Sequence, residues 1–115
     1  MGVRDCAPEI FRRRVVIEGN PNRPVAASEV RSYLMGLSEA LGLEVLLEPV
    51  VHHSDDHGEA GWIRWAAAGA HFYAWDRPCL FFSVDLWLNS QVSLSAAAAF
   101  TRAFFGLEQV EATEV

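Results

Sequence analysis

Apolar positions near the start of the chain follow the pattern of a strand and then a helix. Residues 12–18 contain consecutive β-branched side chains and run into a Gly-, Asn- and Pro-rich stretch at 19–24, which predicts a strand followed by a turn. Ser28 is the predicted N-cap of the helix, and Gly42 is placed to end it in a left-handed conformation. The apolar positions of this helix recur at helical spacing: Val30, Leu34, Leu37 and Leu41.

The middle of the chain is rich in β-branched and aromatic residues and predicts several strands. The strand at 43–53 should bend near Pro49, which cannot donate a ladder hydrogen bond, and therefore lie at an edge or carry a bulge. Residues 54–60 are polar, contain a glycine and are expected to form a loop. The remaining strand candidates span 61–68, 70–75 and 80–88.

The last part of the chain predicts a second helix and a short strand. Ser93 is the expected N-cap of this helix, an apolar stripe follows, and Gly106 ends it, before weak alternation at 109–115. Short connections and this element order predict an α+β two-layer sandwich, a mainly antiparallel sheet with both helices on one face. A chain of 115 residues is expected to form a single domain, residues 1–115.

One face of the predicted sheet collects polar and aromatic groups. Because side chains alternate along a strand, the apolar positions 82, 84, 86 and 88 suit the helices, and the alternate positions face away from them. Burying unpaired polar or charged groups costs about 1 to 3 kcal/mol or more, so they should pair with one another, with a ligand or with another subunit. The groups expected on this open face are Arg64, His71, Tyr73, Trp75, Asp85, Trp87 and Asn89.

Two interpretations of the open face remain. It is either an aromatic dimer interface, with Asp85 bridged to Arg64 or to His71, or a pocket whose aromatic side chains stack on a planar ring or a cation while Asp85 supplies a carboxylate.

Residues 66–89 resemble the central segment of the prokaryotic, pyruvoyl-dependent S-adenosylmethionine decarboxylases. In that family a run of the type E-S-H-L-S-I-H-T-W is followed, after a Pro and an apolar strand, by V-D-I-F-T-C-G. Trp75, Pro78 and the pair Val84 and Asp85 fit this pattern, with one extra residue between the two anchors, and residues 100–106 look like the closing helix end of divergent members. The resemblance implies the same order of elements and the same fold.

The resemblance also implies that the family's reactive groups are missing. The family's self-cleaving Ser, which becomes the pyruvoyl group, corresponds to Ala68, its processing His to Tyr73 and its catalytic Cys to Asn89. Cleavage requires a Ser, Thr or Cys side chain that attacks the preceding carbonyl, and Ala68 has none. We therefore expect an uncleaved, divergent member without a pyruvoyl group or another cofactor, and α-decarboxylation then lacks its electron sink.

From the resemblance we expect a protein that binds S-adenosylmethionine or a related small molecule at the open face or at a subunit interface, without decarboxylating it. Arg64, Trp75, Trp87 and Asn89 are the candidate ligand contacts. A partnership with an active decarboxylase as its regulatory subunit belongs to the same non-catalytic interpretation.

The alternative is a divergent enzyme with lyase, cyclising or transfer chemistry. A sulfonium is already a good leaving group, so such reactions need little more than positioning and a base. In this hypothesis His71 or Tyr73 is the acid or base, and Asp85 positions the cation.

Composition and charge limit the classes of molecule that this chain is expected to bind. With 51% hydrophobic residues, the chain has more apolar surface than a small domain can hide, which favours a homo-oligomer, most simply a dimer. The net charge is −6 and the basic residues are scattered except at 12–14, which argues against nucleic acid. The basic run itself is expected to be a solvated strand edge, with a carboxylate or phosphate contact as the alternative.

Other features predict a cytoplasmic protein without a metal. No apolar run reaches the roughly 18 to 20 residues of a membrane span, and residues 1–10 lack the apolar block of a secretory signal. Cys6 and Cys79 are too isolated for a disulfide framework, and Cys79 is expected to be a packed thiol. The stretch from His52 to Glu59 fits no established ligand spacing, so a solvated loop or a surface lid is expected there, with a metal site as the alternative.

Overall fold

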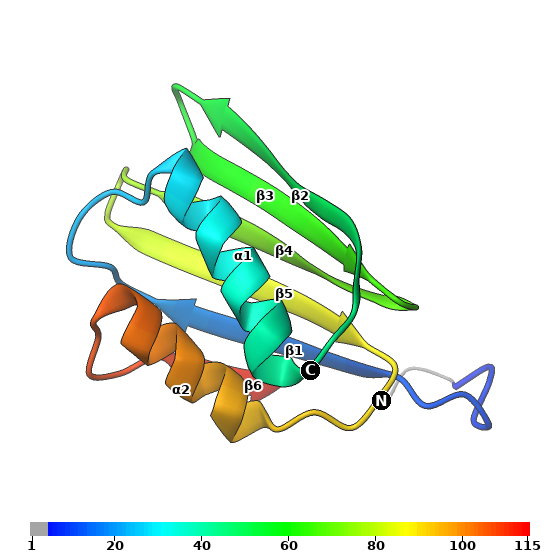
Figure 1. Ribbon diagram of the computed structural model, residues 1–115. Coiled ribbons are helices and arrows are strands. Elements are labelled where there is room, and N and C mark those ends of the chain that lie inside the picture. The colour runs from blue at the N-terminus through cyan, green and yellow to red at the C-terminus, as the bar shows by residue number, and fades with distance from the viewer. Residues whose placement is uncertain (1–4) are drawn as a thin grey trace.

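Six strands form one antiparallel sheet in the order β2-β3-β4-β5-β1-β6 in the computed structural model, which describes residues 5–115. Both helices cover the same face of this sheet (Figure 1). The predicted α+β two-layer sandwich is therefore confirmed. The elements are β1 (Arg13–Gly19), α1 (Ala27–Leu41), β2 (Val45–Ser54), β3 (Gly58–Trp65), β4 (Ala68–Trp75), β5 (Phe81–Leu88), α2 (Leu94–Phe105) and β6 (Glu111–Glu114).

The core lies between the helices and one face of the sheet. The side chains predicted to face the helices from β5, at 82, 84, 86 and 88, are all buried. From the helices, Tyr33 packs against Phe72 and against the phenyl rings of α2. Burial of Tyr33 raises the pKa of its phenol above the ordinary value of 10.0, while its hydroxyl shares a 2.7 Å hydrogen bond with Thr101. The helices thus cover the apolar face of the sheet and leave the opposite face uncovered.

The first helix begins two residues earlier than the sequence predicts. Its N-cap is Ala26 rather than Ser28, and the methyl group of Ala26 cannot accept a cap hydrogen bond. Glu29 supplies the polar contact instead, because its carboxylate accepts the backbone N–H of Ala26 at 3.0 Å and pairs with Arg23. The Arg23 hydrogen bond lowers the pKa of Glu29. The predicted left-handed end at Gly42 is confirmed, with φ 67°.

The expected loop at 54–60 is largely strand. Ser54 pairs with Gly58 across a tight turn, and β3 continues from Gly58 to Trp65. Polar composition misled the sequence prediction here, since ladder hydrogen bonds from β2 and β4 form whatever the side chains are. The predicted strand 61–68 is also wrong at its end, because Ala66 and Ala67 form a turn and Ala68 opens β4.

Strand β2 lies at one edge of the sheet, and its register shifts between Val45 and Val50, as the proline at position 49 predicts. Both Cys6 and Cys79 are free and exposed, so the expectation of a packed thiol at Cys79 is wrong. Within residues 5–115, neither helix has the length and apolar character needed to cross a membrane. Residues 1–4, part of the segment considered for a secretory signal, lie outside the described part.

Candidate functional site

The strand register arranges the open face in rows that run across the sheet. In one row Trp62 lies beside His71, His71 beside Asp85, and Asp85 beside Val16. The next row toward the Ala66–Ala67 turn contains Arg64, Gly69, Trp87 and Arg14 in the same strand order. Four strands, β3, β4, β5 and β1, therefore bring residues far apart in the chain onto one patch.

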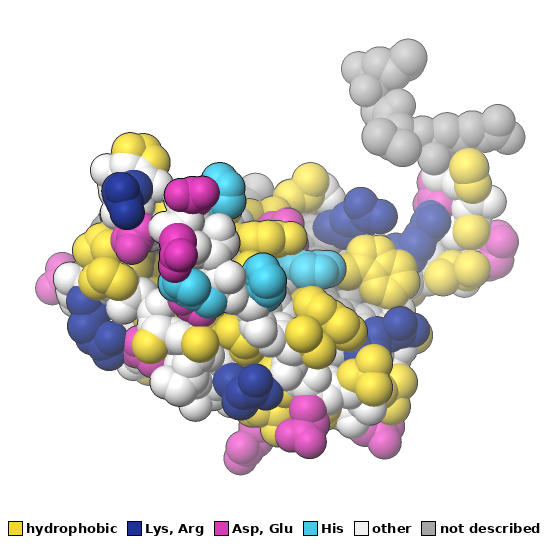
Figure 2. All heavy atoms as spheres, turned by 90° about the horizontal axis from the view of Figure 1, so that it is seen from above, with side chains coloured by type: hydrophobic (Ala, Val, Ile, Leu, Met, Phe, Trp, Pro, Cys, Tyr) yellow, Lys and Arg dark blue, Asp and Glu magenta, His cyan; other side chains and the backbone are white. Residues whose placement is uncertain are grey.

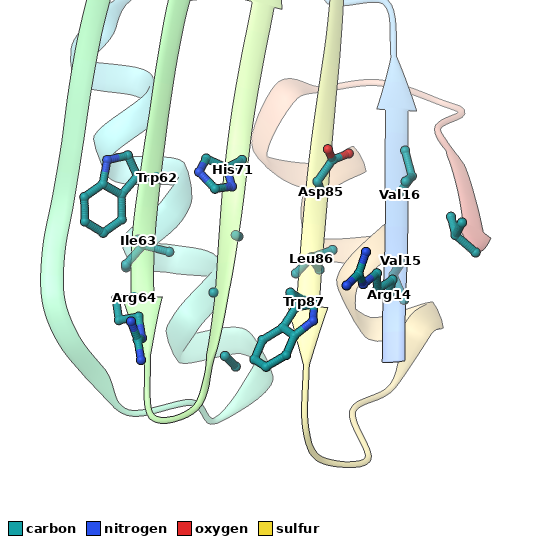
Figure 3. Close-up of a pocket in the computed structure, with 14 residues that line it drawn as sticks. Arg14, Val15, Val16, Trp62, Ile63, Arg64, His71, Asp85, Leu86 and Trp87 are labelled. Carbon is teal, nitrogen blue, oxygen red and sulfur yellow. The ribbon is translucent and has the colours of Figure 1, made fainter. Parts of the chain in front are cut away.

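A hollow of about 710 Å³ lies over these two rows, and we call it the open-face hollow. Figure 3 shows Trp62 and Arg64 on β3, Asp85 and Trp87 on β5, and Arg14 on β1 around it. Its volume falls within the range typical of small-molecule sites. Its lining is formed by Arg14, Val15, Val16, Trp62, Ile63, Arg64, Ala68, Gly69, Ala70, His71, Asp85, Leu86, Trp87 and Val115.

Glycine in the second row accounts for much of this depression. Gly69 lies between Arg64 and Trp87, where any other residue would place a side chain on the open face. A Cβ at this position would come within 3.0 Å of the Ile63 carbonyl oxygen. Indole rings and charged groups therefore surround the hollow, and at Gly69 only backbone atoms lie at its base.

The ion pairs expected for Asp85 are not formed. Within residues 5–115 Asp85 makes no ion pair with Arg64 or with His71, although His71 is its direct neighbour across the strands. Asp85 and His71 are both exposed. Their polar atoms therefore remain available to a bound molecule, and the Asp85 bridges of the dimer-interface interpretation stay a prediction.

The structure brings only part of the predicted site together. Arg64, His71, Asp85 and Trp87 line the open-face hollow, together with Ala68 at the start of β4. Tyr73 and Trp75 share the open face but extend away from the hollow along β4, in a stack with ring centroids 6.0 Å apart. Asn89 lies beyond the end of β5 and outside the hollow.

Trp62, Arg14 and Gly69 are among the lining residues of the hollow that sequence reasoning missed. Trp62 has the same strand parity as Arg64, so the alternation that selected Arg64 could also have selected it. Arg14 was expected at a solvated edge, yet it projects over the sheet from β1, which pairs with β5 rather than ending the sheet. Gly69 carries no chemistry of its own, and nothing in the sequence signals its place at the centre of a row.

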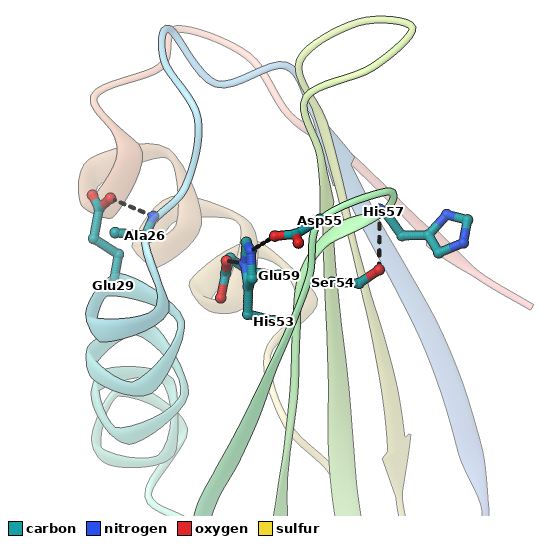
Figure 4. A network of polar contacts seen from close by, with 7 residues as sticks. All are labelled: Ala26, Glu29, His53, Ser54, Asp55, His57 and Glu59. Carbon is teal, nitrogen blue, oxygen red and sulfur yellow. Dashed lines mark hydrogen bonds and ion pairs between the residues drawn. The ribbon is translucent and has the colours of Figure 1, made fainter.

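The stretch from His52 to Glu59 forms a second polar cluster at the β2–β3 turn. His53 lies between two carboxylates, with its Nδ1 against Glu59 and its Nε2 2.9 Å from Asp55 (Figure 4). These hydrogen bonds, that of Glu59 above all, raise the pKa of His53. The other Glu59 oxygen is buried without a hydrogen-bond partner. Figure 2 shows histidine side chains with acidic side chains beside them on the left of that view, and further acidic side chains along the lower edge.

This second cluster is a set of mutual contacts rather than an open ligand set. Among residues 5–115, no group of three or more His, Cys, Asp or Glu side chains is arranged to hold a metal ion. In place of the expected solvated loop, this stretch forms a tight hairpin, and His53 stabilises its turn through contacts with Asp55 and Glu59.

Comparison with solved structures relates this fold to one that is known. The adenosylmethionine decarboxylase from Aquifex aeolicus VF5 is similar to this chain with a TM-score of 0.72 and 13% sequence identity, over 92% of this chain and 89% of that one. At this identity the likeness shows the shared fold alone. A scan of protein-family models and a search of curated protein sequences both give no match.

Proposed function

We propose that this chain is a divergent relative of the S-adenosylmethionine decarboxylases that binds S-adenosylmethionine, or a related small molecule, in the open-face hollow without decarboxylating it. The observation that carries this proposal is the hollow itself, about 710 Å³ of space framed by Trp62 and Trp87 with Asp85 beside it. The fold likeness to the adenosylmethionine decarboxylase from Aquifex aeolicus VF5 supports the choice of ligand.

The chemistry of the hollow suits an adenosyl sulfonium. An indole ring stacks favourably on a planar base and also attracts a cation through its π face. The Asp85 carboxylate has no ion-pair partner within residues 5–115, so a sulfonium or ammonium group can take that place. Together, Trp62, Trp87 and Asp85 would hold the base and the cationic centre of one ligand.

The absence of decarboxylation follows from Ala68. Self-cleavage needs a side-chain hydroxyl or thiol at this position, and the Ala68 methyl group offers neither. Without a pyruvoyl group or another electron sink, the carbanion that loss of carbon dioxide leaves behind is not stabilised. The ligand would then be bound and released unchanged.

A second function is favoured by one observation, the direct pairing of His71 with Asp85 across β4 and β5. An imidazole beside a carboxylate can act as a base toward a sulfonium ligand, whose leaving group is already activated. Lyase, cyclising or transfer chemistry on S-adenosylmethionine would need only this pair and a fixed pose.

A calorimetric titration with S-adenosylmethionine tests the binding proposal. We expect saturable heat for the natural chain and an affinity roughly tenfold or more lower for Asp85→Asn, because a charge-assisted contact is lost. Asp76→Asn, outside the hollow, is the matched control and should bind normally. No heat at millimolar ligand would contradict the proposal.

Two further measurements on the same protein preparations test for chain cleavage and distinguish binding alone from the enzymatic alternative. Intact-mass measurement should give one species with the mass of the whole chain, and two fragments would contradict the loss of pyruvoyl formation. Ligand recovered unchanged supports binding alone. A product that disappears in His71→Ala would instead establish the enzymatic alternative.

A further inference from the structure

The second row of the open-face hollow is positively charged at both ends. Arg64 on β3 and Arg14 on β1 lie on opposite sides of Trp87 (Figure 3). Two strands separate β3 from β1, so the two backbones are about 14 Å apart at the usual strand spacing. Long, flexible arginine stems on both sides can therefore reach one group placed over Gly69.

Neither guanidinium group has a carboxylate partner in the described part of the chain. Within residues 5–115 neither Arg14 nor Arg64 forms an ion pair, whereas Arg12, Arg13 and Arg23 each do. The chain as a whole carries a net charge of −6, so this pair is a local positive region on an acidic protein. A guanidinium presents parallel N–H donors that match the oxygens of a carboxylate or a phosphate.

The negative group of the hollow lies in the other row. Asp85 is two residues from Trp87 on the same strand, which places the rows about 7 Å apart. The hollow therefore has an anion-attracting end and a cation-attracting end. Each row contains one indole ring, Trp62 in the row of Asp85 and Trp87 in the row of the two arginines.

We propose that Arg14 and Arg64 bind an anionic group of the ligand, a carboxylate or a phosphate, over the bare backbone of Gly69. This inference rests on the proposed function, because it assigns one end of the same hollow. It makes the anion a condition of tight binding. A ligand that keeps its carboxylate is then preferred over the same molecule without it.

Titration of the whole chain with four probes tests this inference: S-adenosylmethionine, decarboxylated S-adenosylmethionine, adenosine 5′-monophosphate and adenosine. We expect S-adenosylmethionine to bind roughly 10- to 100-fold more tightly than its decarboxylated form, which differs only in the carboxylate. The double variant Arg14→Gln with Arg64→Gln should remove this preference. Arg77→Gln, in the loop outside the hollow, should keep it.

The probes separate this inference from the proposed function. Equal affinity for the two sulfonium ligands in the natural chain would overturn the role of the arginines and leave adenosyl-sulfonium binding in place. Binding of the monophosphate, but of neither sulfonium nor adenosine, would identify phosphate as the anion and overturn the proposed ligand. Failure of all four to bind overturns both. The comparison of probes on the natural chain decides the matter even where the double variant folds poorly.

Discussion

Within the core, Ser38 supplies the hydrogen-bond acceptor for the indole of Trp65, the largest fully buried side chain among residues 5–115. The Trp65 indole N–H donates to the Ser38 hydroxyl at 2.7 Å, and that hydroxyl donates to the Leu34 carbonyl, also at 2.7 Å. Ser38 is 2% exposed and Trp65 is fully buried, so water cannot replace either contact. This pair locks α1 onto β3 beneath the open face.

We predict that Ser38→Ala lowers the free energy of unfolding by roughly 1 to 3 kcal/mol, because the buried Trp65 N–H loses its acceptor. Urea denaturation of both proteins measures this difference. Ser32→Ala, on the exposed side of the same helix, should stay within about 0.5 kcal/mol of the natural chain. Equal effects of the two substitutions would show that the hydrogen bond contributes nothing.

At the scale of an element, the β2–β3 hairpin depends on the charge of His53. Contacts with Glu59 and Asp55 raise the His53 pKa above its ordinary value of 6.5. Because the folded pKa is raised, the contribution of His53 to stability is complete below pH 6.5 and is lost as the pH rises through the raised value. His53→Gln should therefore lower the Tm at pH 5.5 and change it little at pH 9.

Thermal melting of the natural chain and the variant at both pH values measures this dependence. His57→Gln is the matched control, because it lies in the same turn and points away from the two carboxylates (Figure 4). A His53→Gln effect of the same size at both pH values would contradict the ionic role of His53.

At the scale of the whole molecule, exposed apolar side chains favour self-association. Tyr73, Trp87 and Val50 lie on the open face and are 39%, 41% and 49% exposed. Figure 2 shows hydrophobic side chains at several points of the surface in that view. A second copy placed against the open face would cover them and enclose the hollow.

We predict a homodimer in sedimentation experiments, with the open face as the interface. Tyr73→Glu should shift the protein toward a single copy, because it places a charge in an apolar contact. Met35→Glu, at an exposed apolar position of α1 on the helical side, should leave the dimer intact. A single copy at all concentrations of the natural chain excludes this assembly.

Local patterns in the sequence were sufficient for most of the fold. Helical spacing of Val30, Leu34 and Leu37 predicts the buried side of α1, and all three are fully buried. The cap was misplaced because Glu29 reaches back to Ala26, a contact that depends on how the preceding turn lies. The strand that begins at Gly58 was missed because its hydrogen bonds are made with neighbouring strands. Such backbone pairing does not require a particular pattern of polar and apolar side chains in the strand itself.

Which face each strand residue occupies was determined by the sequence alone, because side chains alternate with a period of two whatever the surroundings. Alternation thus placed Asp85, His71 and Arg64 together on the open face. Which of these residues are neighbours was decided only by the tertiary structure, because register and strand order come from pairing between distant segments. That pairing brought Arg14 beside Trp87, placed Gly69 at the centre of the hollow and left Tyr73, Trp75 and Asn89 outside it.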